Sequence, residues 1–245
     1  MKRKHISFII FGIGLLVIAY PWIMRPFTFM EEINAVNEYY EMVDDLDPKE
    51  EQELVEEYEY YNELLAGEDV DGNFISQEEL DNLDRDELDY KNSGSNSAIA
   101  DDVDREISKK GFTNGRILGA IRIPKLNLKI PIYQGATVEN LWSGVGHVSG
   151  TSLPTGEIGS HSVIAGHNRL RNKKLFTTIH KLNKGDVFKV VSLGKEMNYE
   201  VVDMIVVEPY ETDYLMPVEG KDKVTLLTCS DFGEKRLLVM GERKK

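Results

Sequence analysis

A single thiol is the most reactive side chain of this 245-residue chain. Cys229 ends an apolar run that begins at Val224, and a Ser-Asp-Phe-Gly turn follows it directly. A side chain at a strand end can act as a nucleophile, but a lone cysteine is more often buried and inert. A nucleophilic thiol also needs a base or a cation beside it, because an unperturbed cysteine has a pKa of about 8.5. The other side chains that the fold brings to Cys229 therefore decide between the two interpretations.

Five histidines are candidate bases, and position favours His167. It follows the apolar run Ser162–Gly166 and opens a loop, which is the placement that Cys229 also has. Two strands of one barrel can end at the same rim, so these two side chains can meet there. His5 is excluded because it lies in the basic N-terminus. The other histidines are His147, His161 and His180.

Arg236 is the candidate cation. It comes seven residues after Cys229 and opens the apolar run Leu237–Met240, so a hairpin would return it beside the thiol. A guanidinium there could donate hydrogen bonds to a developing oxyanion or to a substrate carbonyl. The alternative is an ordinary exposed arginine at the start of a strand.

Short apolar runs separated by turns predict a mainly β domain over residues 108–245. Their length and β-branched content are typical of strands. So many short strands within one domain indicate a closed barrel or a sandwich. The runs are Ile117–Ile123, Leu128–Tyr133, Ser162–Gly166, Val187–Val191, Tyr199–Val207, Val224–Thr228 and Leu237–Met240. No glycine-rich phosphate loop occurs, so nucleotide chemistry has no support.

Charge separates this domain from what precedes it. Residues 31–107 hold 28 acidic and 4 basic side chains, whereas residues 108–245 hold 14 acidic and 21 basic ones. The net charge of the chain is −13, which argues against nucleic acid as a partner because phosphate binding needs a basic surface.

The uncharged residues 6–24 predict a membrane anchor. As a helix they reach about 28 Å, close to the hydrocarbon thickness of a bilayer. A cleaved secretory signal would need a shorter apolar core and a small-residue cleavage site. Bases before the run and acids after it predict a single-pass protein of the cell membrane, with residues 1–5 in the cytoplasm and the catalytic domain outside.

Residues 25–66 are expected to be an extracytoplasmic helical segment, in which residues 31–66 form two helices that meet at Asp47 and Pro48. Asp47 is a good N-cap, and Glu50 completes a capping box with it. One face of the second helix is apolar and needs a partner. That face consists of Leu54, Tyr58, Tyr61 and Leu65.

The acidic residues 67–107 stand before the first strand and are placed to act as a lid over Cys229. Within them, Asp69 to Glu79 resembles a calcium loop of the EF-hand type, although the spacing is wrong by one residue and the sixth-position glycine is missing. An acidic turn that caps a short helix is the simpler interpretation, so calcium there stays a hypothesis.

The residues around the three candidates resemble the sortases, the membrane-bound cysteine transpeptidases of Gram-positive bacteria. Thr225-Leu-Leu-Thr-Cys229 with Arg236 behind it is similar to the Thr-Leu-x-Thr-Cys signature and trailing arginine of that family. Other segments between about residues 115 and 243 are similar in the same order. They are Ile117–Leu126, Pro131–Tyr133, Gly144–His147, Gly150–Pro154 and His161–His167.

The resemblance implies a closed sortase-type barrel of about eight strands with short helices. It makes Cys229 the nucleophile, His167 the general acid and base, and Arg236 the stabiliser of the oxyanion or substrate. It leaves His147 outside the catalytic set, and His161 and His180 are expected to be structural.

Within the family the chain is most similar to class C, the pilin-polymerising type. Gly150–Pro154, Lys174–Thr177 and Tyr61–Leu65 are typical of that class. The chain departs from it in lacking an Asp-Pro-aromatic lid motif, of which Asp89-Tyr90 is the nearest equivalent, and a second hydrophobic anchor before Lys245.

The implied reaction is attack by Cys229 on the Thr-Gly bond of a Leu-Pro-x-Thr-Gly-like sorting signal in a pilin or surface protein. A thioester forms and an amine resolves it, without a cofactor. In class C the amine is a lysine of another pilin. The alternatives are a sortase that uses a cell-wall precursor to anchor surface proteins, and a membrane-tethered binding module without enzymatic activity.

Overall fold

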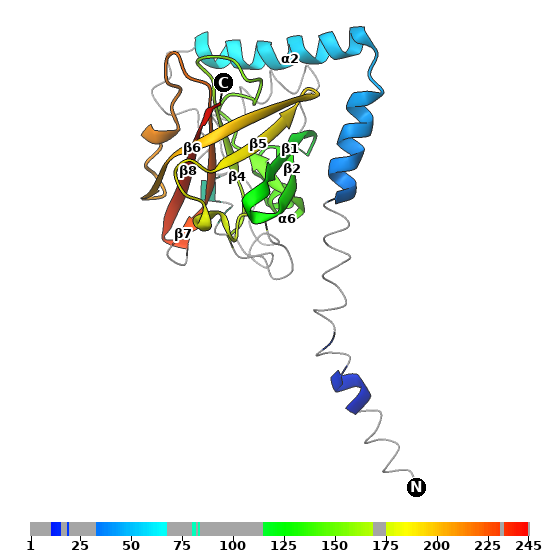
Figure 1. Cartoon of the computed structure of the whole chain (residues 1–245), viewed down its shortest axis with the longest axis vertical. Coiled ribbons are helices and arrows are strands. Elements are labelled where there is room, and N and C mark those ends of the chain that lie inside the picture. The colour runs from blue at the N-terminus through cyan, green and yellow to red at the C-terminus, as the bar shows by residue number, and fades with distance from the viewer. Residues whose placement is uncertain are drawn as a thin grey trace.

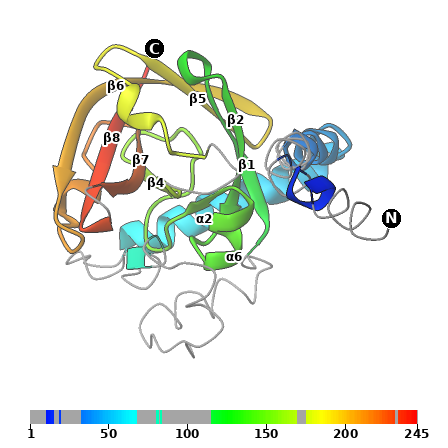
Figure 2. The ribbon, with the colours of Figure 1, turned by 90° about the horizontal axis from the view of Figure 1, so that it is seen from below.

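In the computed structural model of this chain, the strands close into one barrel (Figure 2). The structure describes residues 11–15, 19, 33–67, 80–81, 83, 115–168, 175–230 and 233–244. The order of the strands around the barrel is β1-β2-β3-β4-β7-β8-β6-β5. The predicted closed barrel of about eight strands is therefore confirmed, and the sandwich is excluded.

All seven predicted runs are strands, and the barrel has one further short strand, β3. The strands are β1 Ile117–Ile123, β2 Leu128–Gln134, β3 Val145–His147, β4 His161–Ala165, β5 Val187–Ser192, β6 Lys195–Val207, β7 Lys223–Ser230 and β8 Lys235–Arg243. The helical elements with defined bounds are α2 Pro48–Gly67, α6 Val138–Ser143, and the 3-10 turns η2 Pro124–Leu126, η3 Ile179–Lys181 and η4 Asp213–Leu215. β3 escapes prediction because three residues show no periodicity.

The pairing of β4 with β7 determines where the functional residues lie. These two strands are parallel, and Ala165 is opposite Leu227. All of β4, and all of β7 before Ser230, is buried, as expected of a parallel pair inside a barrel. Because parallel strands end at the same edge, the residues that follow β4 and those that end β7 share one rim of the barrel.

The predicted capping box at the start of α2 is confirmed. Asp47 Oδ1 accepts hydrogen bonds from the backbone N–H groups of Lys49 and Glu50 at 2.8 and 2.9 Å. Glu50 Oε2 accepts one from the Asp47 N–H at 3.0 Å. These bonds satisfy N–H groups that the first helical turn leaves unpaired. The preceding helix covers residues 33–44.

The apolar face of α2 packs against the barrel, and Figure 1 shows the helix lying across one end of it. Tyr58 and Tyr61 are 1% and 3% exposed. Asn62 reaches the loop after β3, where its Oδ1 accepts from the Leu153 N–H at 2.7 Å and its Nδ2 donates to Thr155 Oγ1 at 3.2 Å. The apolar face of α2, which the sequence predicts to need a partner, therefore packs against the barrel.

Parts of the N-terminal predictions lie outside the described residues. Of the predicted anchor, residues 6–24, the structure describes 11–15 and 19, which are helical. The possible calcium loop, residues 69–79, is not among the described residues. Where the structure describes the chain, it groups no three His, Cys, Asp or Glu side chains that could hold a metal ion.

No helix within the described residues has both the length and the apolar character needed to cross a membrane.

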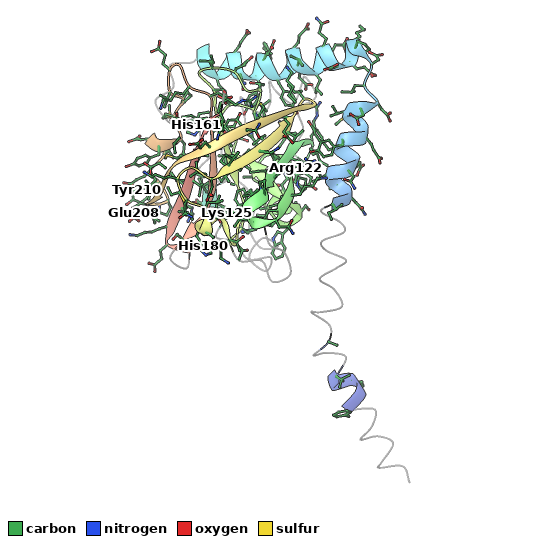
Figure 3. All side chains as sticks on the ribbon, viewed as in Figure 1. Arg122, Lys125, His161, His180, Glu208 and Tyr210 are labelled. Carbon is green, nitrogen blue, oxygen red and sulfur yellow. The ribbon has the colours of Figure 1, made fainter. Side chains whose placement is uncertain are left out.

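Two buried histidines hold loops of the barrel. His161 Nδ1 lies 2.9 Å from Met216 O, and its Nε2 lies 2.7 Å from Thr225 Oγ1. His147 Nε2 lies about 3 Å from two carbonyl oxygens of the loop after β3. Burial lowers the pKa of each to about 4. His161 lies toward the end that α2 covers, and the exposed His180 lies toward the opposite end (Figure 3).

We predict that His147 and His161 make the fold sensitive to acid. Each has a pKa of about 4 when folded and 6.5 otherwise, so between these values the unfolded chain binds more protons. Above the pKa of the unfolded chain, these histidines do not lower the free energy of unfolding. As the pH drops toward the pKa of the folded chain, the free energy of unfolding falls by up to about 3 kcal/mol for each histidine.

Urea unfolding near pH 7 and near pH 4.5 measures this loss. His147→Gln should lower stability at neutral pH but lose about 2 kcal/mol less than the wild type on acidification to about pH 4.5. His180→Gln is the matched control at an exposed site and should follow the wild type. An acid loss in His147→Gln as large as that of the wild type would contradict the prediction.

Candidate active site

The β7–β8 hairpin places Cys229 opposite Arg236. The two residues are cross-strand partners, and Ser230 faces Lys235 in the next pair. Directly opposed side chains of an antiparallel pair lie on the same face of the sheet. Cys229 is 8% exposed and Arg236 1% exposed. The predicted return of Arg236 beside the thiol is confirmed, and the alternative of an ordinary exposed arginine is wrong.

The β4–β7 pair brings His167 to the same rim. The Gly166 N–H donates to Leu227 O at 3.0 Å. Thr228 Oγ1 donates to Gly166 O at 2.6 Å. These bonds hold the backbone directly before His167 against the backbone directly before Cys229. His167 is 6% exposed, and its predicted place at the shared strand ends is confirmed.

The approach to His167 requires a glycine. A Cβ atom at Gly166 would lie 2.8 Å from ring carbon Cδ2 of Phe176 and 2.8 Å from Cγ1 of Val145. Real Cβ atoms essentially never come that close to other heavy atoms. The turn that carries His167 out of β4 therefore packs tightly against β3 and the loop after β4.

Helix α6 supplies an aromatic neighbour of His167. The rings of Trp142 and His167 have centroids 6.1 Å apart and planes at 62°, an edge-to-face arrangement. Asn140 fixes the helix on the end of β2, because its Nδ2 donates to Gln134 O at 2.7 Å and to Gly135 O at 2.8 Å. Sequence reasoning missed Trp142, because nothing in its spacing ties it to the candidate histidine.

Residues of the acidic segment 67–107 contact both partners of the hairpin. Cys229 Sγ donates to Leu83 O at 3.3 Å. Arg236 Nη2 donates to Leu80 O at 3.3 Å, and its Nη1 donates to Gly233 O at 2.9 Å. Leu80 and Leu83 are 1% and 4% exposed and belong to the apolar cluster that includes Cys229. The described part of the segment therefore lies on the candidate site, where the sequence predicts a lid.

This arrangement has the components of acyl transfer through a thioester. A thiol, an imidazole and a guanidinium come from strand ends at one rim, and all three residues are buried. A thiol attacks a carbonyl, an imidazole exchanges protons with the leaving and entering groups, and a guanidinium donates to the oxygen that becomes negative.

A groove of about 660 Å³ lies elsewhere in the molecule. Its walls come from the end of α2, the loop before β4 and the loop before β7, and include Leu65, Ser160 and Met216. It adjoins the start of β7, and the six residue steps from Lys223 to Cys229 span about 20 Å in a strand. The groove is therefore separate from the candidate site.

Comparison with known proteins agrees with this chemistry. A sequence model described as a sortase domain matches residues 121–244. Sortase A of Bacillus anthracis is 28% identical over 63% of this chain and 75% of its own length. Sortase D of Bacillus subtilis is 28% identical over 60% of this chain and 75% of its own length.

Solved structures that resemble the chain are mainly class C sortases. Sortase C of Clostridium perfringens, with its C-terminal cell wall sorting motif, is 35% identical and superposes with a TM-score of 0.66, over 87% of this chain and 99% of that one. Sortase C1 of Streptococcus agalactiae, in complex with MTSET, is 31% identical with a TM-score of 0.68, over 86% and 97% of the two chains. With the domain match, the closed barrel and the thiol at its rim, these similarities show that the chain belongs to the sortase family of cysteine transpeptidases.

Proposed function

We propose that this chain is a pilin-polymerising sortase of class C. It cleaves a Leu-Pro-x-Thr-Gly-like sorting signal between Thr and Gly and joins the threonine to a lysine amine of another pilin. The observation that carries the proposal is the contact of residues 80 and 83 with Arg236 and Cys229. A segment ahead of the barrel that covers the thiol suits an enzyme that must open for a large protein substrate.

Cys229, His167 and Arg236 have separate roles in the proposed first step. Cys229 gives its thiol proton to His167, and the resulting thiolate attacks the threonine carbonyl carbon while Arg236 donates hydrogen bonds to the oxygen as it gains negative charge. The carbon–nitrogen bond to glycine then breaks, and His167 gives the departing amine its proton. The products are a thioester on Cys229 and the released glycine end of the signal.

The second step uses the same groups, with His167 now accepting a proton. A lysine amine attacks the thioester carbonyl and gives a proton to His167. The carbon–sulfur bond breaks, so an isopeptide bond forms and Cys229 is restored. The placement of all three groups at one rim supports this reuse.

Class C is favoured over a wall-anchoring sortase by the extent of the similarity. The two class C structures named above match 86–87% of this chain. Sortases A and D match 60–63% of it. Membership of the sortase family argues against the non-enzymatic binding module.

The proposed location is the outer face of the cell membrane. The uncharged residues 6–24, with bases before them and acids after them, support a single-pass anchor with the barrel outside. An enzyme held there would meet secreted pilins as they leave the membrane.

Thioester formation tests the proposed chemistry. We predict that the chain, mixed with a Leu-Pro-x-Thr-Gly peptide, gains the mass of the peptide fragment that ends in threonine, and that hydroxylamine removes it. Cys229→Ala should show no adduct, because the nucleophile is gone. Intact-mass spectrometry measures both. An adduct that persists in Cys229→Ala would contradict the assignment of the nucleophile.

The acceptor distinguishes a pilin-polymerising sortase from an anchoring one. We predict that a peptide with an internal lysine resolves the preformed thioester at least about tenfold faster than oligoglycine does, a difference of about 1.4 kcal/mol in activation free energy. Mass spectrometry of the product locates the new bond on the lysine side chain. Resolution by oligoglycine alone would favour the anchoring alternative.

The proposed lid is tested through the side chains that hold it. Leu83→Ala removes buried apolar contacts worth about 2–5 kcal/mol, so the segment should open more often and alkylation of Cys229 by a small thiol reagent should become at least about tenfold faster. Leu54→Ala, which truncates a buried leucine of α2, is the matched control. Equal alkylation rates in Leu83→Ala and the wild type would contradict the lid.

A further inference from the structure

A side-chain hydrogen bond joins the residues that follow β4 to the end of β7. Asn168 Nδ2 donates a hydrogen bond to Cys229 O at 2.8 Å. The donor belongs to the residue directly after His167, and the acceptor is the backbone carbonyl of Cys229. One hydrogen bond therefore links the backbones that carry two of the proposed catalytic groups.

The register of the parallel pair explains why a donor is needed there. Ala165 is opposite Leu227, and the Gly166 N–H donates to Leu227 O at 3.0 Å. In a parallel ladder this relation recurs every two residues. The next bond would join the N–H of residue 168 to Cys229 O. β4 has ended at Ala165, and the side-chain amide of Asn168 donates to that carbonyl instead.

His167 is consequently held on both sides while it lies outside the strand. Before it, Gly166 is bonded to β7 through its N–H and through its carbonyl, which accepts from Thr228 Oγ1 at 2.6 Å. After it, Asn168 is bonded to Cys229. The Trp142 ring lies against the imidazole from α6. These contacts fix the backbone of His167, which carries the imidazole, relative to the backbone of Cys229, which carries the thiol.

We propose that Asn168 is a positioning residue that sets the placement of the His167 imidazole relative to the Cys229 sulfur. The inference rests on the proposed roles of these two residues. Proton exchange needs hydrogen-bond reach between the groups involved, and a misplacement of about 1 Å can cost about 100-fold in rate. An asparagine suits the task because its amide donates without adding charge beside the imidazole.

Three variants of the full chain test the proposal. Asn168→Leu keeps the approximate size of the side chain but has no donor. Asn168→Gln keeps the amide donor on a side chain that is longer by one methylene. Asn62→Leu is the matched control, because it removes an amide that donates to a loop carbonyl, Leu153 O at 3.3 Å, at the end of the barrel that α2 covers.

Two measurements separate positioning from loss of stability. The first is the rate of single-turnover thioester formation with a Leu-Pro-x-Thr-Gly peptide, as a function of pH and peptide concentration. The second is an NMR titration of the His167 ring proton on Cε1, which needs no substrate.

Asn168→Leu should slow thioester formation by about 10- to 100-fold, change KM by less than about twofold, and shift the His167 titration. Asn168→Gln should recover part of the rate. Asn62→Leu should lower the unfolding temperature and keep the pH profile and titration of the wild type.

An unchanged pH profile and titration in Asn168→Leu, or an equal change of both in Asn62→Leu, would overturn the proposal. Absence of a thioester in the wild type would refute the proposed function instead. In that case the His167 titration alone decides whether Asn168 positions the imidazole.

Discussion

The parallel pairing of β4 with β7 is the constraint on which the site depends. Ala165 and Leu227 are opposite each other, so the residues two positions further along, His167 and Cys229, reach the same rim. β7 is buried on both faces, which leaves its apolar residues no solvent-facing register. Because β7 also pairs with β8, a single strand has the histidine on one side and Arg236 on the other.

Local signals explain what could be predicted from the sequence. Apolar runs predicted seven strands, and the short interval from Cys229 to Arg236 predicted the hairpin. The capping pattern of Asp47 and Glu50 predicted the start of α2. Each depends on residues that are neighbours in the chain. The burial of Arg236 could not be predicted in this way, because the atoms that cover it come from a segment about 150 residues earlier.

Contacts made by backbone atoms explain what the sequence concealed. Leu80 and Leu83 approach the site through their carbonyl oxygens, which every residue type possesses, so no motif marks them. The chain lacks the Asp-Pro-aromatic lid motif, and these two carbonyls nevertheless contact both the guanidinium and the thiol. The apolar side chains of the two leucines, which pack in the same cluster as Cys229, fix the carbonyls in place.

The chemistry of these carbonyls bears on how the site would open. A thiol that donates to Leu83 O keeps its proton, so this contact and an ionised Cys229 exclude each other. Arg236 donates to a neutral carbonyl at Leu80, and a hydrogen bond of that kind is weaker than one to a carboxylate. A substrate carbonyl is an acceptor of the same type. Exchange of Leu80 O for that carbonyl would therefore cost Arg236 little, and displacement of the lid would leave the guanidinium bonded and the thiol able to lose its proton.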